Sequence, residues 1–175
     1  MKTGSNIGVI ERLLPPICSK KKIAEAARLI GNELTLFEET LQLTTATDTR
    51  TADMASWVAR TWAQDHLEEA RKYVGKIIVI LKKDRSDPTT RNLTGLLTDV
   101  GFPERNYSSI STLAFKLLLQ KDRAVAVHAN ALSLLLPIIE KHPDLRKEVG
   151  LIARTHPNLK KGSFQVRIKK ALAEN

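Results

Sequence analysis

The chain has 175 residues, of which 42% are hydrophobic, 27% are charged and only 5% are aromatic. The apolar fraction excludes a disordered chain, and the scarcity of aromatic residues argues against a β-sandwich or a β-barrel. Lys and Arg outnumber Asp and Glu by 28 to 19, which gives a net charge of +9, and the single cysteine, Cys18, excludes an internal disulfide or a cysteine-based zinc site.

Helical periodicity predicts an all-α fold. Five apolar residues, Val125, Ala129, Leu132, Leu136 and Ile139, recur on one face of a helix, and no stretch alternates long enough to indicate a strand. In chain order the expected helices cover residues 6–17, 20–31, 33–45, 49–64, 66–82, 88–99, 107–120, 123–141, 144–155 and 163–174.

Helix-capping residues mark the breaks between these helices. Ser19, Asp48, Asp87, Asp122 and Ser163 each stand where a helix can begin. Two further breaks are near copies, His142-Pro143-Asp144-Leu145 and His156-Pro157-Asn158-Leu159, in which Pro prevents continuation of the preceding helix. We interpret both histidines as charges near a helix C-terminus.

Four helix starts share one pattern, which predicts an internal repeat. Asp48, Asp87, Asp122 and Ser163 are each followed by a β-branched residue three positions later and by Arg or Ala four positions later. These starts are separated by 39, 35 and 41 residues. The period is in the range of helical solenoids, in which a helix pair buries its apolar stripe only by stacking on its neighbours.

This pattern resembles the HEAT and armadillo-type repeats, whose second helix commonly opens Asp-x-x-Val-Arg-x-x-Ala. The resemblance implies an α-α superhelix of about five stacked helix pairs in a single domain over 1–175, with residues 6–31 as a degenerate first repeat. An ordinary helical bundle is the alternative architecture. The stripes predict that six side chains are buried: Trp62, Leu113, Leu117, Leu132, Leu136 and Ile139.

In HEAT-like solenoids the second helices line a concave surface, and this likeness implies a binding groove here. The candidate binding residues lie on the polar sides of these helices: Arg28, Asp53, Trp57, Arg60, Arg91, Asn130 and Lys169. Trp62 falls within the apolar arc of its helix, whereas Trp57 falls outside it, beside Arg60. Two interpretations of Trp57 stay open: a binding hot spot, or a residue that packs against a neighbouring repeat.

No catalytic or metal-binding motif appears in the sequence, and we predict no cofactor. His128 projects among apolar residues and is interpreted as an inner, hydrogen-bonded histidine. Cys18 lies beside three lysines, and nearby positive charge is one way to activate a thiol, but a plain buried or semi-buried cysteine is favoured. The acidic pairs Glu38-Glu39 and Glu68-Glu69 are interpreted as solvated faces, because helix neighbours point about 100° apart.

Three functions are compatible with these features. The first is a non-enzymatic HEAT-like scaffold that binds a protein partner on its concave face. The second is nucleic-acid binding: at the level of fold the chain resembles the HEAT-like DNA alkylation-repair glycosylases, which would make Trp57, Asp53 and Arg60 the candidates, although no motif matches. The third is an all-α enzyme such as a lyase, but the Gly-Ser-Ser-x-Met-Pro loop of that superfamily is absent.

The location expected from the sequence is the cytoplasm. The longest apolar run covers residues 77–81, far short of the roughly 20 residues that a bilayer requires. The first residues contain no apolar segment of the kind found in a signal peptide. The C-terminal residues 141–175 carry nine basic and three acidic side chains, which fit either a solvated end or contact with nucleic acid or an acidic protein.

Overall fold

The computed structural model describes residue 14 and residues 19–173, and these residues form ten α-helices, one 3-10 helix and no strand. The expected all-α fold is therefore confirmed for the described residues. The helix predicted over 6–17 and the interpretation of Cys18 fall outside them.

The contacts divide the chain into two compact units, residues 1–100 and residues 101–175, called unit 1 and unit 2 below. The expected single domain over 1–175 stays a prediction.

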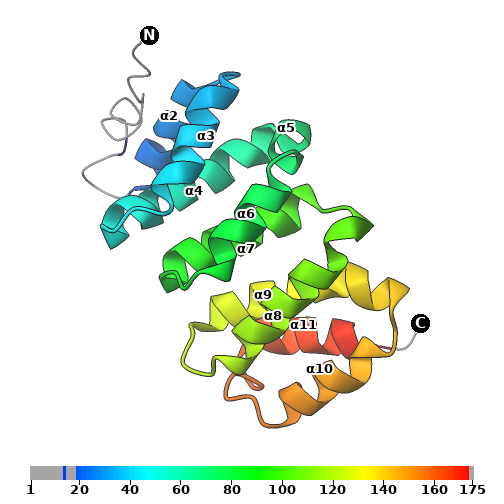
Figure 1. The fold of residues 1–175 in the computed structure, drawn as a ribbon. Helices are drawn as coiled ribbons and strands as arrows, with labels where there is room; N and C mark the ends of the chain where they lie inside the picture. The colour runs from blue at the N-terminus through cyan, green and yellow to red at the C-terminus, as the bar shows by residue number, and fades with distance from the viewer. Residues whose placement is uncertain (1–13, 15–18, 174–175) are drawn as a thin grey trace. The chain divides into compact units, whose positions relative to one another are not determined.

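Unit 1 is built around one central helix, α4 (Figure 1). Its described helices are α2 (Lys20–Ile30), α3 (Leu34–Leu43), α4 (Thr49–Asp65), α5 (Leu67–Arg71), α6 (Val74–Lys82) and α7 (Asp87–Val100). α4 packs against α2, α3 and α7, and α7 also contacts α5 and α6. Asp48 caps α4 as predicted, because its carboxylate accepts the backbone N–H of Thr51.

Small residues allow α4 to have neighbours on several sides. Ala52, Ala55, Ala59 and Ala63 are all buried, so adjacent helices approach the α4 backbone closely. Trp62 is 1% exposed, which confirms the prediction that it belongs to the core. It is the largest buried side chain in an aromatic cluster with Phe37, His66 and Tyr73.

The Trp62 indole lies between two other rings. Its ring centroid is 4.0 Å from that of Phe37 on α3 and 4.3 Å from that of His66, both in stacked geometry. Its Nε1–H donates to the carbonyl oxygen of Gly31 at 2.8 Å. The polar end of a buried indole therefore has an acceptor, as burial requires.

The helix predicted over 66–82 is in fact two helices, α5 and α6. The chain turns at Lys72 and Tyr73, where Tyr73 has backbone angles of φ −95° and ψ 3°. The Tyr73 ring makes an edge contact with Phe37, with centroids 5.1 Å apart. Because no Pro or capping residue marks this turn, local sequence signals did not predict it.

Unit 2 contains four α-helices after a short 3-10 helix, η1 (Glu104–Asn106). The α-helices are α8 (Tyr107–Leu119), α9 (Val125–Lys141), α10 (Leu145–Arg154) and α11 (Gly162–Leu172). α9 packs against both α8 and α11, and α10 packs against α11. α9 is therefore the helix with the most extensive burial in this unit.

Five of the six side chains predicted to be buried are so. Leu113, Leu117, Leu132 and Ile139 in unit 2 join Trp62, whereas Leu136 is only half-buried. That expectation was wrong because α9 turns Leu134, Leu135 and Ile138 into the core instead. Because α9 packs against both α8 and α11, its buried face is wider than the stripe expected from the sequence and is slightly rotated from it.

The two His-Pro copies have different environments, which corrects their common interpretation. His142 is exposed, but His156 is 4% exposed and is not a charged side chain at a helix end. Its ring stacks on Phe164 with centroids 4.4 Å apart and meets His128 edge-on at 4.5 Å. Burial between rings favours the neutral imidazole, and Nε2 of His156 lies 3.2 Å from the carbonyl oxygen of Leu118.

Asn158 joins the two buried histidines. Its backbone N–H donates to Nδ1 of His156 at 3.2 Å, and its side-chain amide donates to Nδ1 of His128 at 2.8 Å. Nε2 of His128 lies 2.9 Å from the carbonyl oxygen of Gln120. Because a carbonyl only accepts, Nε2 carries the proton on both rings. The interpretation of His128 as an inner, hydrogen-bonded histidine is confirmed.

Candidate functional site

An open pocket of about 420 Å³ lies on unit 1 where three helices meet. α2, α4 and α7 each contribute to its wall. The lining residues are Lys20, Ala24, Trp57, Arg60, Thr61, Gln64, Arg91 and Asn92. Among the described residues of its wall three are basic and none is acidic, so this part of the pocket favours an anionic group.

Three predicted binding residues, Trp57, Arg60 and Arg91, come together in this pocket. Trp57 and Arg60 are half-buried on α4, and Arg91 is exposed on α7. Trp57 is thus neither a fully exposed side chain nor a core residue. An aromatic face beside guanidinium groups suits a ligand with a carboxylate or phosphate next to an apolar part.

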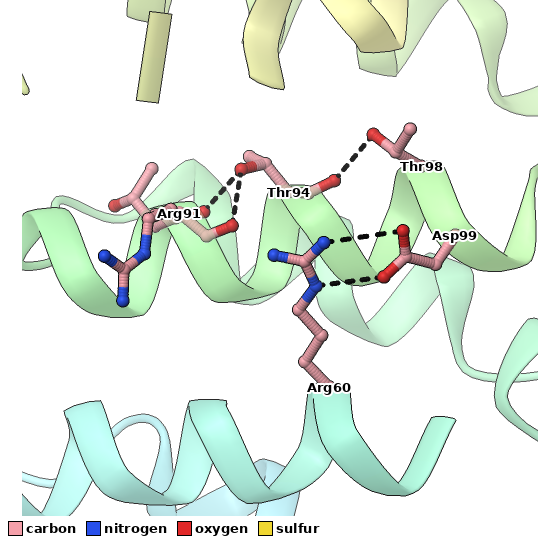
Figure 2. A network of polar contacts seen from close by, with 6 residues as sticks. Arg60, Arg91, Thr94, Thr98 and Asp99 are labelled. Carbon is pink, nitrogen blue, oxygen red and sulfur yellow. Dashed lines mark hydrogen bonds and ion pairs between the residues drawn. The ribbon is translucent and has the colours of Figure 1, made fainter. Parts of the chain in front are cut away.

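Arg60 is held in place by an ion pair with Asp99. Figure 2 shows its side chain reaching from α4 to α7, where Nε lies 2.9 Å from Oδ2 of Asp99 and Nη2 lies 3.4 Å from Oδ1. The two side chains are 30% and 28% exposed. A forked pair of this kind fixes the guanidinium plane, although its net stabilisation is small because water reaches it.

Gly95 provides the space for this ion pair. A Cβ atom at Gly95 would stand 2.3 Å from Cζ of Arg60, so the guanidinium lies directly on the α7 backbone. Any side chain at this position would displace Arg60. The glycine therefore positions a pocket residue that belongs to a different helix.

Asp53 serves to join two helices. Its Oδ1 accepts hydrogen bonds from the hydroxyl groups of Ser86 and Thr89, the latter at 2.8 Å. The Ser86 hydroxyl in turn accepts the backbone N–H of Thr89 in the first turn of α7. The Asp53 carboxylate thus secures the start of α7 and does not line the pocket.

The other predicted residues lie elsewhere. Arg28 is exposed on α2 but does not line the pocket. Asn130, half-buried on α9, and Lys169, exposed on α11, belong to unit 2. Sequence reasoning missed Lys20, which follows the Ser19 cap. The signal available in the sequence was a basic residue in the first turn of a helix, whereas the packing of that helix, α2, against α4 comes from the structure.

Two classes of site find no support in the described part of the chain. Residues 19–173 contain no group of three or more His, Cys, Asp or Glu side chains able to hold a metal ion. None of the helices in this range has the length and hydropathy needed to cross a membrane.

No protein-family model, curated protein or solved structure matches this chain.

Proposed function

We propose that this chain is a non-enzymatic helical-repeat protein that binds a protein partner at the pocket formed by α2, α4 and α7. The proposal rests on one observation: α2, α4 and α7 form a single open pocket that contains Trp57, Arg60 and Arg91 and, among the described residues, no acidic side chain in its wall. The partner surface would supply a carboxylate for the basic side of the pocket, where Arg60 is already paired with Asp99, and an apolar group for Trp57.

The proposed architecture is a HEAT-like superhelix of about five stacked helix pairs, with the pocket on its concave face. The contacts within each unit support it. Hairpin pairs form between α3 and α4 and between α8 and α9, and the second helices also pack on one another, α4 against α2 and α7, and α11 against α9. Among the described residues, the first helices contact one another less extensively, as expected if the second helices line the inner side of a curved stack.

Preorganisation favours binding at this pocket. The Asp99 ion pair orders Arg60 before any partner arrives, and the half-buried Trp57 is restricted by its own helix packing. Side chains ordered in advance lose less conformational entropy on binding. Aromatic residues and Arg are also the side chains that contribute most at protein interfaces.

The experiment compares partners captured from native lysate by the wild-type chain and by two pocket variants, Trp57→Ala and Arg91→Glu. Lys76→Glu, on α6, is the matched control, since it reverses a charge at an exposed position outside the pocket. We expect the same proteins with wild type and control, and at least about tenfold less of them with either pocket variant. Equal recovery with Arg91→Glu would contradict the proposal.

Nucleic-acid binding is the second candidate, favoured by the net charge of +9 and the three basic side chains in the pocket. Nuclease treatment of the lysate separates the two functions, because it removes partners that are held through nucleic acid. An affinity for DNA or RNA that falls steeply with salt would support this candidate, since phosphate contacts release counterions.

A further inference from the structure

Unit 2 carries a second groove, which the proposed function does not use. It lies between α10 and α11, with a volume of about 660 Å³. Its apolar wall includes Leu151, Leu159, Ile168 and Leu172. Ile168 is buried, whereas Leu151 is 64% exposed and Leu172 is 37% exposed. Leu151 and Leu172 therefore expose apolar surface to water next to the buried side chain of Ile168.

Gly150 adds no side chain to this groove. It lines the groove beside Leu151, and a Cβ atom placed on it would lie 3.6 Å from Cδ2 of Leu172. This is an ordinary van der Waals distance, so no steric clash requires a glycine here. Its absent side chain leaves room between α10 and α11 for an apolar group from another molecule.

The sides of the groove are basic. Arg146, Lys147 and Arg154 line it, and no acidic side chain within residues 19–173 does. Nε of Arg146 is shielded from solvent and has no hydrogen-bond partner among the described residues. Because this shielded atom is also out of reach of a ligand, an incoming carboxylate would pair with the exposed charges of Lys147 and Arg154.

We propose that the α10–α11 groove binds an acidic amphipathic helix of a partner protein. Its apolar residues would lie against Leu151 and Leu172, and its Asp or Glu residues would face Arg146, Lys147 and Arg154. α10 has ten residues and is about 15 Å long, which matches three turns of a bound helix with apolar residues at i, i+3 or i+4, and i+7.

Charge decides between this occupant and a second copy of the chain. Residues 141–173 hold nine basic and two acidic side chains, so a symmetric contact through this groove would oppose like charges. An acidic helix instead complements both the apolar floor and the basic sides.

The test uses the full chain and a fluorescent synthetic peptide of about 14 residues made of Ala, Leu and Glu, with Leu on one helical face. One control peptide carries Lys in place of Glu, and another has the same composition with Leu scattered around the helix. Fluorescence anisotropy measures binding, and ¹⁵N chemical-shift changes locate it. We expect saturable binding of the Glu peptide at α10 and α11 only, and no comparable binding of either control.

Matched variants identify the groove residues. Leu151→Ser and Arg154→Glu should each weaken binding about tenfold, since they remove apolar contact and reverse a rim charge. Val166→Ser and Lys170→Glu make the same changes at exposed positions of α11 outside the groove, and should change affinity less than about twofold. Circular dichroism melts check that all four variants fold.

Four results would overturn the proposal: no saturable binding, equal binding of the Lys or scattered peptide, insensitivity to Leu151→Ser and Arg154→Glu, or shifts confined to unit 1. Two further measurements address other occupants. A dimer in sedimentation equilibrium that Leu151→Ser dissociates would assign the groove to a second copy. Cosedimentation with phosphatidylcholine–phosphatidylglycerol vesicles that Leu151→Ser abolishes, with peptide binding unchanged, would assign it to a membrane surface.

Discussion

The two tryptophans of α4 have different environments only five residues apart. Trp62 is 1% exposed and lies between Phe37 and His66, whereas Trp57 is half-buried in the pocket wall. We expect Trp62→Ala to lower the free energy of unfolding by about 3–5 kcal/mol, and Trp57→Ala to lower it by clearly less. Urea denaturation of both variants measures the difference. An equal loss would identify Trp57 as a packing residue and weaken the case for a binding role.

Because His156 is buried, we expect unit 2 to lose folding stability in mild acid. Its pKa lies below the usual 6.5, chiefly because burial penalises the charged ring, and also because His128 and Lys121 repel a positive charge. The unfolded chain then binds the proton more tightly than the folded chain does. Stability is therefore complete above about pH 6.5 and falls as the pH drops from that value toward the lower folded-state pKa.

Melting temperatures measured between about pH 5 and pH 8 check this expectation. His156→Gln should reduce the loss between neutral and acid pH, even if it lowers stability at every pH. His142→Gln, at the exposed copy of the motif, should leave the pH dependence as in the wild type. A wild-type profile retained by His156→Gln would show that another group is responsible.

At the scale of elements, Asp53 links α4 to the start of α7 through the hydroxyl groups of Ser86 and Thr89. Asp53→Ala should lower the free energy of unfolding by about 1–3 kcal/mol, because these part-buried groups lose a charged acceptor. Chemical denaturation gives the value. Asp65→Ala, at the exposed end of α4, should change stability by no more than about 0.5 kcal/mol. Equal effects would contradict the linking role.

The orientation of α9 leads to a second prediction at this scale. Leu132 is buried and Leu136 is half-buried on the same helix. Leu132→Ala should cost about 2–5 kcal/mol of folding stability, from lost transfer free energy and the cavity that remains. Leu136→Ala should cost less, because its surroundings include water. Thermal or urea denaturation that ranks Leu136→Ala as the more costly variant would show a different helix rotation.

At the scale of the whole molecule, the division into two compact units affects whether the chain unfolds as one cooperative unit or as two. Leu93 is buried in unit 1 and Leu132 in unit 2. In native-state hydrogen exchange, Leu93→Ala should lower protection mainly within residues 20–100, and Leu132→Ala mainly within 101–173, since local stability follows local contacts. Equal loss along the chain in both variants would support the single cooperative domain expected from the repeat.

Much of the secondary structure could be predicted from the sequence, because helix formation depends on neighbours within a few residues. Apolar spacing and caps such as Asp48 located α2 to α4 and α7 to α11 closely. The polar side of α4 also indicated Trp57 and Arg60 as surface residues. The turn at Tyr73 was missed because its contact with Phe37 comes from a different helix.

Only the tertiary structure determined which polar side chains are already paired within the protein and which are open to a partner. Asp53 is bound to residues 33 and 36 positions away, and Arg60 to one 39 positions away, so periodicity on one helix contains no information about them. The burial of His156, likewise, depends on Phe164 and on the carbonyl of Leu118. Local free energies select the helices, whereas packing between distant segments selects which faces are buried, paired or open to a partner.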